Sequence, residues 1–333
     1  MANEMDRGQA WLWRRGTRPA AAGLTAHRLS GITPAVLPPA ATRARQGQVA
    51  KPLLGPRLAL GWCLAAMACV PADPPLPVPQ ATVARSDTRV LPGPALSPAE
   101  IEAEGARLRE VLTREVPSAT GPGPWQEQGW VARVQAAVAR AGLVLDRPQL
   151  LVSVDRSPGV QALAILLARP DGPWDVLGGS YVSTGQANRR GYYITPTGVF
   201  LHTDAILDWR AEGTFNENHI RGLGLKGMRV WDFGWVQASK GWRADKELGE
   251  IRFLLHATDP DYLEQRLGRP ASKGCVRIPA AMNRFLDRHG VLDADQERAA
   301  ASDGRFRALL LPDREPTPLA GRALVVVDSS ETF

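Results

Sequence analysis

The sequence has few cysteines and no long apolar run. Three cysteines in 333 residues are too few for a disulfide-stabilised scaffold. No apolar run approaches the roughly 18 residues of a membrane-spanning helix, which excludes a polytopic membrane protein. Hydrophobic residues nevertheless make up 44% of the chain, enough to bury a core, so wholesale disorder is not expected.

The net charge of +6 is concentrated at the N-terminus. Residues 1–72 carry +7, and the remainder of the chain carries −1. A domain that binds nucleic acid needs its positive charge on the folded part, where it can meet phosphates. The charge distribution therefore argues against nucleic acid as a partner.

An apolar run of 13 residues, 58–70, ends this basic region. Lys51 and Arg57 precede it and small residues follow it, which is typical of a secretory signal. A short buried helix is the alternative. The proline-rich stretch 73–79 that comes next reads instead as an extended linker.

Two processing sites fit the signal equally well. Cleavage before Cys69 would make this cysteine the lipidated residue of a lipoprotein, whereas cleavage after Ala72 would release a soluble protein. We therefore predict a leader over 1–72, a linker over 73–96 and export to the periplasm or cell envelope. Membrane contact is expected only through the signal or the lipid. The length of the segment before the signal also suggests Val49 as the true start.

Two helices are predicted in a segment spanning residues 97–147. Ser97 can cap the first helix, and Glu100 stands at the capping-box spacing. The second helix is predicted over 125–141, where apolar residues recur on one face, and Gly142 ends the helix. We expect this pair to precede and pack against the main domain.

From residue 148 the pattern changes to short apolar runs separated by glycine and proline, which is typical of strands. The predicted strands are 150–154, 163–167, 176–184, 198–202, 229–236, 251–256 and 323–327, with a helix over 279–289. We therefore predict a mainly β domain with peripheral helices, of the α+β class, over residues 148–333.

Cys275 is the one cysteine outside the leader, and His256 lies 19 residues before it. A histidine at a strand end and a cysteine in the following loop can form a thiolate–imidazolium pair, in which the imidazolium lowers the thiol pKa. Gly274 would allow a close approach to the thiol. The alternative, an inert buried cysteine and a core histidine, is favoured by composition alone.

Four blocks surround these two residues in order. They are 182–185 (Val-Ser-Thr-Gly), 195–200 (Thr-Pro-Thr-Gly-Val-Phe), His256, and 272–277 (Ser-Lys-Gly-Cys-Val-Arg). The pattern resembles the L,D-transpeptidase family, with its YkuD-type catalytic domain, over roughly 149–292. The resemblance implies a β-sandwich catalytic domain that acts on peptidoglycan stem peptides without a cofactor.

The resemblance also implies roles for individual residues. Cys275 would attack the third residue of a tetrapeptide stem and form a thioester, with His256 relaying the proton. Backbone N–H groups near Gly274 and Cys275 would bind the oxyanion. Ser272 would orient the turn or His256, and Arg277 would anchor a carboxylate or brace the loop.

One residue departs from the family pattern. Lys273 stands where the family signature has histidine before Gly-Cys. It could supply charge near the thiolate, bind a substrate carboxylate or be a solvated loop lysine. This change affects the expected recognition of the substrate more than the expected type of reaction.

The acceptor is not indicated by sequence. A stem amine would give a 3→3 cross-link, water would make the chain an L,D-carboxypeptidase, and another envelope amine would make it a different transferase. A non-catalytic wall-binding module is a further alternative, and it predicts an unreactive cysteine.

Other residues carry less weight. His202 could line the cleft but is better explained as a structural histidine, and His219 as a loop residue. Trp231, Trp235 and Trp242 could form a stacking surface, although packing explains them more simply. The histidines and cysteine contain no close ligand pair, so no metal site is predicted.

Overall fold

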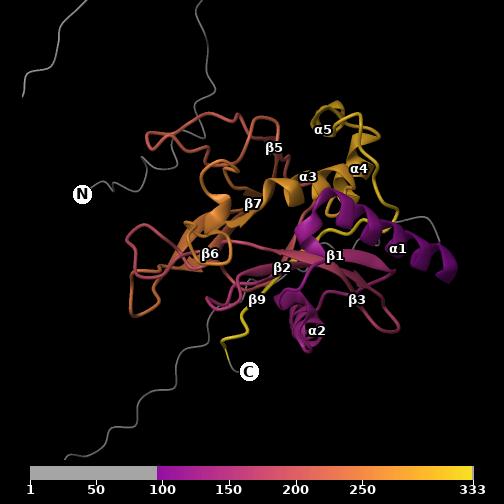
Figure 1. The fold of residues 1–333 in the computed structure, drawn as a ribbon, viewed down its shortest axis with the longest axis horizontal. Coiled ribbons are helices and arrows are strands. Elements are labelled where there is room, and N and C mark those ends of the chain that lie inside the picture. Colours follow the sequence, from indigo (N-terminus) through magenta and orange to yellow (C-terminus); the bar gives the residue numbers. More distant parts are fainter. Residues whose placement is uncertain (1–95, 332–333) are drawn as a thin grey trace, which may run out of the picture. The chain divides into compact units, whose positions relative to one another are not determined.

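Residues 96–331, the part of the chain that the computed structural model describes, form two β-sheets and five α-helices (Figure 1). The predicted leader, Cys69 and the predicted linker apart from Leu96 lie outside these residues. The helices are α1 (Pro98–Glu115), α2 (Trp130–Ala141), α3 (Ala280–Arg288), α4 (Ala294–Ala300) and α5 (Gly304–Leu309). The strands are β1 (Gln149–Asp155), β2 (Ala162–Ala168), β3 (Asp175–Tyr181), β4 (Gly198–Leu201), β5 (Trp209–Arg210), β6 (Arg229–Ser239), β7 (Leu248–Ala257), β8 (Val276–Ile278) and β9 (Ala323–Val327).

The first sheet has the strand order β3-β2-β1-β9-β4, and the second has the order β5-β6-β7-β8. The predicted hairpin of β1 and β2 is present and antiparallel. β9, from the C-terminal end, lies parallel to β1 and between β1 and β4. The predicted arrangement, mainly β with peripheral helices, is therefore confirmed.

The side chains of β1 alternate between two apolar layers, as a strand requires. Val152 and Val154 join a core that also contains Phe253 and Leu255 of β7 and the apolar face of α1. Leu151 faces the other way, into a cluster with α2. Figure 1 shows α1 and α2 on opposite sides of the sheet. The two helices are thus part of the same packed unit as the strands.

The helix ends follow local chemistry, with one error of prediction. The capping box is present, because Glu100 N–H donates to Ser97 Oγ (3.3 Å) and Ser97 N–H donates to Glu100 (2.7 Å). The second helix does not begin at residue 125 as predicted. Pro124–Gln126 forms a 3-10 turn, and Gly129 adopts a φ of 101°, so the α-helix starts at Trp130. None of the described helices is long and apolar enough to cross a membrane.

Candidate active site

The strand pairing of β7 and β8 brings His256 and Cys275 to one face of the second sheet. β8 runs parallel to β7, with His256 opposite Arg277 and Leu255 opposite Val276. Leu255 and Val276 both enter the core between the sheets. Because strand side chains alternate, His256, Cys275 and Arg277 lie on the opposite face.

The turn that carries the thiol is fixed by two hydroxyl groups. Ser272 Oγ accepts a hydrogen bond from Gly274 N–H (3.1 Å) and donates one to the Cys275 carbonyl oxygen (2.6 Å). Thr195 Oγ1 donates to the Gly274 carbonyl oxygen (2.7 Å) and accepts from Gly185 N–H (2.8 Å). The buried hydroxyl of Thr195 therefore joins both early blocks to the signature turn.

The first block also forms backbone bonds to the signature. Ser183 and Arg277 exchange two hydrogen bonds of 2.9 Å, and Ser272 N–H donates to the Thr184 carbonyl oxygen (2.9 Å). The buried Gln161 side chain binds Thr184 at both its N–H (2.8 Å) and its Oγ1 (2.7 Å). Sequence reasoning missed Gln161, for which no local signal exists. Thr195 could have been found within its block.

Gly274 is required by the turn itself. Its φ is 130°, and a Cβ there would lie 2.8 Å from Ile251 Cδ1 and 3.4 Å from Tyr193 Cβ. The close approach expected at this glycine is thus made by the protein's own side chains. The Gly274 N–H is already bonded to Ser272, so Cys275 N–H is the remaining candidate oxyanion donor of the expected pair.

The Cys275 thiol is half-buried at the edge of β7. It donates to the Arg252 carbonyl oxygen at 3.6 Å. Burial raises the pKa of Cys275 to about 11, although the Leu254 N–H and the charge of Arg277 act in the opposite direction and Asp232 adds to the rise. Burial therefore favours the neutral form of the thiol near pH 7.

The imidazole of His256 is buried and is held by its neighbour. Nδ1 lies 2.8 Å from the Ala257 carbonyl oxygen. A carbonyl only accepts, so we assign the proton to Nδ1, which leaves Nε2 with its lone pair. Burial, and then the charge of Arg277, lower the pKa of His256 to about 4 despite the bond to Ala257. The directions of these two pKa shifts favour a neutral thiol and a neutral imidazole in the free protein, and the thiolate–imidazolium pair stays a prediction.

The charge of Arg277 acts on both the thiol and the imidazole. One of its guanidinium nitrogens, Nη1, donates to the Ala271 carbonyl oxygen (3.4 Å), whereas Nε is buried without a hydrogen-bond partner. Within residues 96–331 it forms no ion pair with a carboxylate. Burial lowers the pKa of Arg277, and the Cys275 thiol and Tyr192 act in the opposite direction. The side chain of Lys273 is exposed, with its ammonium 5.9 Å from the Tyr192 ring centre.

His202 belongs to a separate buried network and does not line this site. Nε2 lies 2.8 Å from Asp208, and Nδ1 lies 2.9 Å from the Leu292 carbonyl oxygen. Both partners are acceptors, so both ring nitrogens carry protons and the ring is an imidazolium. Although burial opposes it, Asp208 raises the pKa of His202. Arg229 binds the same carboxylate at 2.9 Å, which completes a structural role for this histidine.

The tryptophans do not form one stacking surface. Trp231 is fully buried in the core between the sheets, while the Trp235 side chain is half exposed. Trp242 packs edge-on against Tyr193 at 5.3 Å between ring centres. His219 lies in an exposed loop, as predicted. No cluster of three metal-ligating side chains occurs in the described part of the chain.

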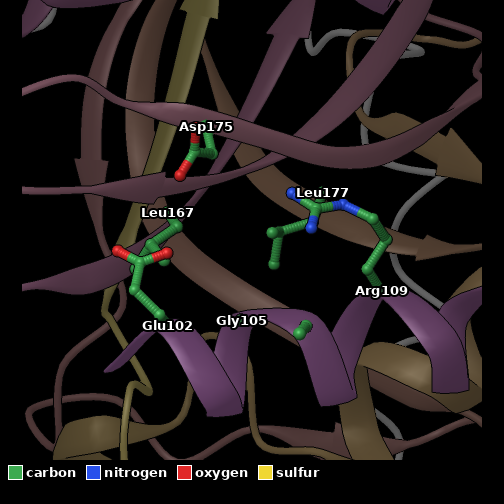
Figure 2. A pocket seen from close by; sticks show the side chains of 7 residues that line it. Glu102, Gly105, Arg109, Leu167, Asp175 and Leu177 are labelled. Carbon is green, nitrogen blue, oxygen red and sulfur yellow. The ribbon is translucent and has the colours of Figure 1, made fainter. Parts of the chain in front are cut away.

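A pocket of about 240 Å³ lies between α1 and the strands β2 and β3, lined by none of the candidate site residues (Figure 2). Glu102 and Asp175 are among the residues that line it. Arg169 forms ion pairs with Glu102 (2.6 Å) and Asp175 (2.8 Å). The carboxylates of Glu102 and Asp175 are thus paired with Arg169, and we interpret the pocket as a gap at the helix–sheet junction rather than a reactive site.

Comparison with known proteins adds no relative: no protein-family model matches the chain, and no curated protein matches it. The candidate site consists of the Cys275 thiol, the buried imidazole of His256 and the guanidinium of Arg277, which forms no ion pair within residues 96–331.

Proposed function

We propose that this chain is an exported cysteine acyltransferase of peptidoglycan, with the catalytic fold and chemistry of the L,D-transpeptidases that its motifs resemble. One observation carries the proposal. Four sequence blocks that are separated along the chain are joined by hydrogen bonds and strand pairing around one thiol. Packing alone does not require the Ser272 and Thr195 hydroxyls to fix the turn beside a half-buried cysteine.

The donor would be a tetrapeptide stem of peptidoglycan. Sγ of Cys275 attacks the carbonyl carbon on the L-centre of the diaminopimelate residue, while His256 Nε2 takes the thiol proton. The tetrahedral oxyanion is bound by the Cys275 N–H. The bond to D-alanine then breaks, the leaving amine takes the proton from His256, and a thioester remains on the cysteine.

An amine resolves the thioester and regenerates the thiol. The side-chain amine of a second diaminopimelate gives a 3→3 cross-link, and water gives a shortened stem instead. His256 takes the proton of the attacking amine and returns it to the sulfur as the thioester bond breaks. A neutral imidazole with a free Nε2 suits both steps, since it must accept a proton first.

Arg277 suits the carboxylate of the departing D-alanine. Its charge lies near both the thiol and the imidazole, and within residues 96–331 no carboxylate pairs with it. A guanidinium in a partly dry site binds a carboxylate with paired hydrogen bonds. Binding of that carboxylate would offset the charge that lowers the pKa of His256, so the donor itself would make the imidazole a better base.

The direct test is acylation by a carbapenem. The full chain is incubated with the carbapenem, and its intact mass is measured. We expect one covalent adduct on the wild type, and one on the double variant Cys63→Ala, Cys69→Ala, which lacks the two cysteines of the predicted leader. We expect none on Cys275→Ala. His256→Gln should slow acylation by about 10²- to 10⁴-fold. A wild type without an adduct, or an adduct that persists on Cys275→Ala, would contradict the proposal.

Product analysis then identifies the acceptor. A purified tetrapeptide donor is supplied with and without an amine acceptor, and the products are separated by mass. Release of D-alanine together with a cross-linked dimer indicates transpeptidation, whereas a tripeptide alone indicates carboxypeptidation. Comparison of muropeptides from cells with and without the gene would place either activity in the envelope.

A further inference from the structure

Two exposed cations lie against the ring of one tyrosine beside the thiol turn. The Arg189 guanidinium lies 4.2 Å from the centre of the Tyr192 ring, and the Lys273 ammonium lies 5.9 Å from it. The Tyr193 N–H bonds to the Lys273 carbonyl oxygen (3.3 Å), which holds the two segments together. The two cations thus share one aromatic ring, next to the turn that carries Cys275.

The two cations have no acidic partner among the residues that the structure describes. Neither Arg189 nor Lys273 forms an ion pair there, and neither does Arg277. Nearby Arg252, in contrast, is paired with buried Asp232 at 2.7 Å. Two like charges against one ring repel each other, and an anionic ligand would relieve that repulsion.

The departure of Lys273 from the family signature adds to this charge. A lysine ammonium is charged at neutral pH, whereas a histidine in the same place would be largely neutral. The substitution therefore adds a permanent positive charge directly beside Gly274 and the thiol turn. The tyrosine face holds that charge in place through a cation–π contact.

We propose that Arg189, Tyr192 and Lys273 form a second anion subsite, which binds a carboxylate of the acyl donor other than the one that Arg277 binds. The inference rests on the proposed function and names its preferred substrate: a stem peptide whose internal carboxylates are free. Stem peptides carry two such groups, one on the glutamate residue and one on diaminopimelate. Amidation of the group that is bound would weaken the donor.

The test uses the full chain and four tetrapeptide donors. One donor has both internal carboxylates free, two are amidated at one position each, and one is amidated at both. We expect the wild type to prefer the free donor, mainly through a lower KM. Of the two singly amidated donors, one should have a higher KM than the free donor and the other should not. The donor with the higher KM identifies which carboxylate is bound.

Variants separate this subsite from general charge effects. Lys273→Gln and Arg189→Gln should each lose about two- to fivefold in kcat/KM on the free donor, as expected for exposed ion pairs, and the double variant should lose the preference. Arg190→Gln is the matched control, because this exposed neighbour does not contact the tyrosine, and its preference should match the wild type. Raising the salt concentration should reduce the wild-type preference, since exposed charges are screened.

Binding of the same four peptides to Cys275→Ala distinguishes the two proposals. Turnover of all donors at equal efficiency would overturn the subsite while leaving the acyltransferase in place. Selective binding of the free donor without any turnover by the wild type would support the subsite and contradict the acyltransferase. Equal binding of all four peptides by Cys275→Ala would also overturn the subsite. So would a loss of preference in Arg190→Gln as large as that in the Lys273 and Arg189 variants.

Discussion

Cys275 of the free protein should react slowly with alkylating agents below about pH 9. With a pKa of about 11, roughly one thiol in ten thousand is ionised at pH 7. A free cysteine, with a pKa of ~8.5, is about 300-fold more ionised. A thiolate of higher pKa is intrinsically more nucleophilic, which recovers about tenfold, so the net rate should be roughly 30-fold below that of free cysteine.

The assay is iodoacetamide labelling from pH 5 to pH 10.5, followed by intact mass. The Cys63→Ala, Cys69→Ala variant makes Cys275 the only thiol, and the same chain in urea provides the unfolded reference. The logarithm of the rate should rise linearly with pH, without a plateau in the neutral range. Arg277→Gln should slow labelling further, because the charge of Arg277 lowers the thiol pKa.

A plateau between pH 5 and pH 8 would refute this reasoning. It would show that the thiol is already ionised and therefore paired with an imidazolium, as in cysteine hydrolases with a thiol pKa near 4. Labelling in the native state faster than in urea would lead to the same conclusion. Either result would mean that the burial of the site is smaller in solution than the structure gives.

Three further outcomes test the packing. His202→Gln removes the imidazolium from buried Asp208 and should lower the free energy of unfolding by about 3 kcal/mol at pH 6. The folded pKa of His202 is raised, so its contribution to stability is complete below about pH 6.5 and is lost as pH rises through the folded pKa. In urea unfolding, the difference in free energy between the wild type and His202→Gln should therefore shrink at alkaline pH. A difference that stays constant with pH would contradict the imidazolium. Gly274→Ala forces a Cβ into the left-handed region at a cost of about 1–3 kcal/mol, and it should reduce carbapenem acylation at least tenfold while circular dichroism stays native. Trp130→Phe loses the buried bond from Nε1 to Ser153 Oγ (2.9 Å) and should cost about 1 kcal/mol in guanidinium unfolding, with little further loss when Ser153→Ala is added.

Local signals predicted the elements that have a local cause. The capping box placed the start of α1, and short apolar runs bounded by turn residues placed β1 and β2. The start of α2 was misjudged because the helix was predicted to begin at Trp125, directly after the glycine- and proline-containing break 118–124. Trp125 instead belongs to a 3-10 turn that buries its side chain, and Gly129, in the left-handed conformation, separates that turn from the helix.

Elements made by distant partners left no periodic signal. β8 has three residues, too few for a pattern, and it exists because β7 pairs with one side of it and Ser183 with the other. The charge of His202 likewise depends on Asp208 and on a carbonyl 90 residues away. Motif spacing identified Cys275 and His256 as candidates, but it does not report their burial, which shifts the pKa of each toward its neutral form.

The face on which His256 lies depends on the register of β7. Leu255 pairs with Val276 and enters the core between the sheets, so His256 at the next position lies on the other face of the second sheet, as Arg277 does. A slip of one residue would turn the imidazole into the apolar core and put a leucine on the face of Arg277. Burying an imidazole there without a partner costs free energy. The apolar packing between the two sheets therefore selects the register that places His256 and Cys275 on one face.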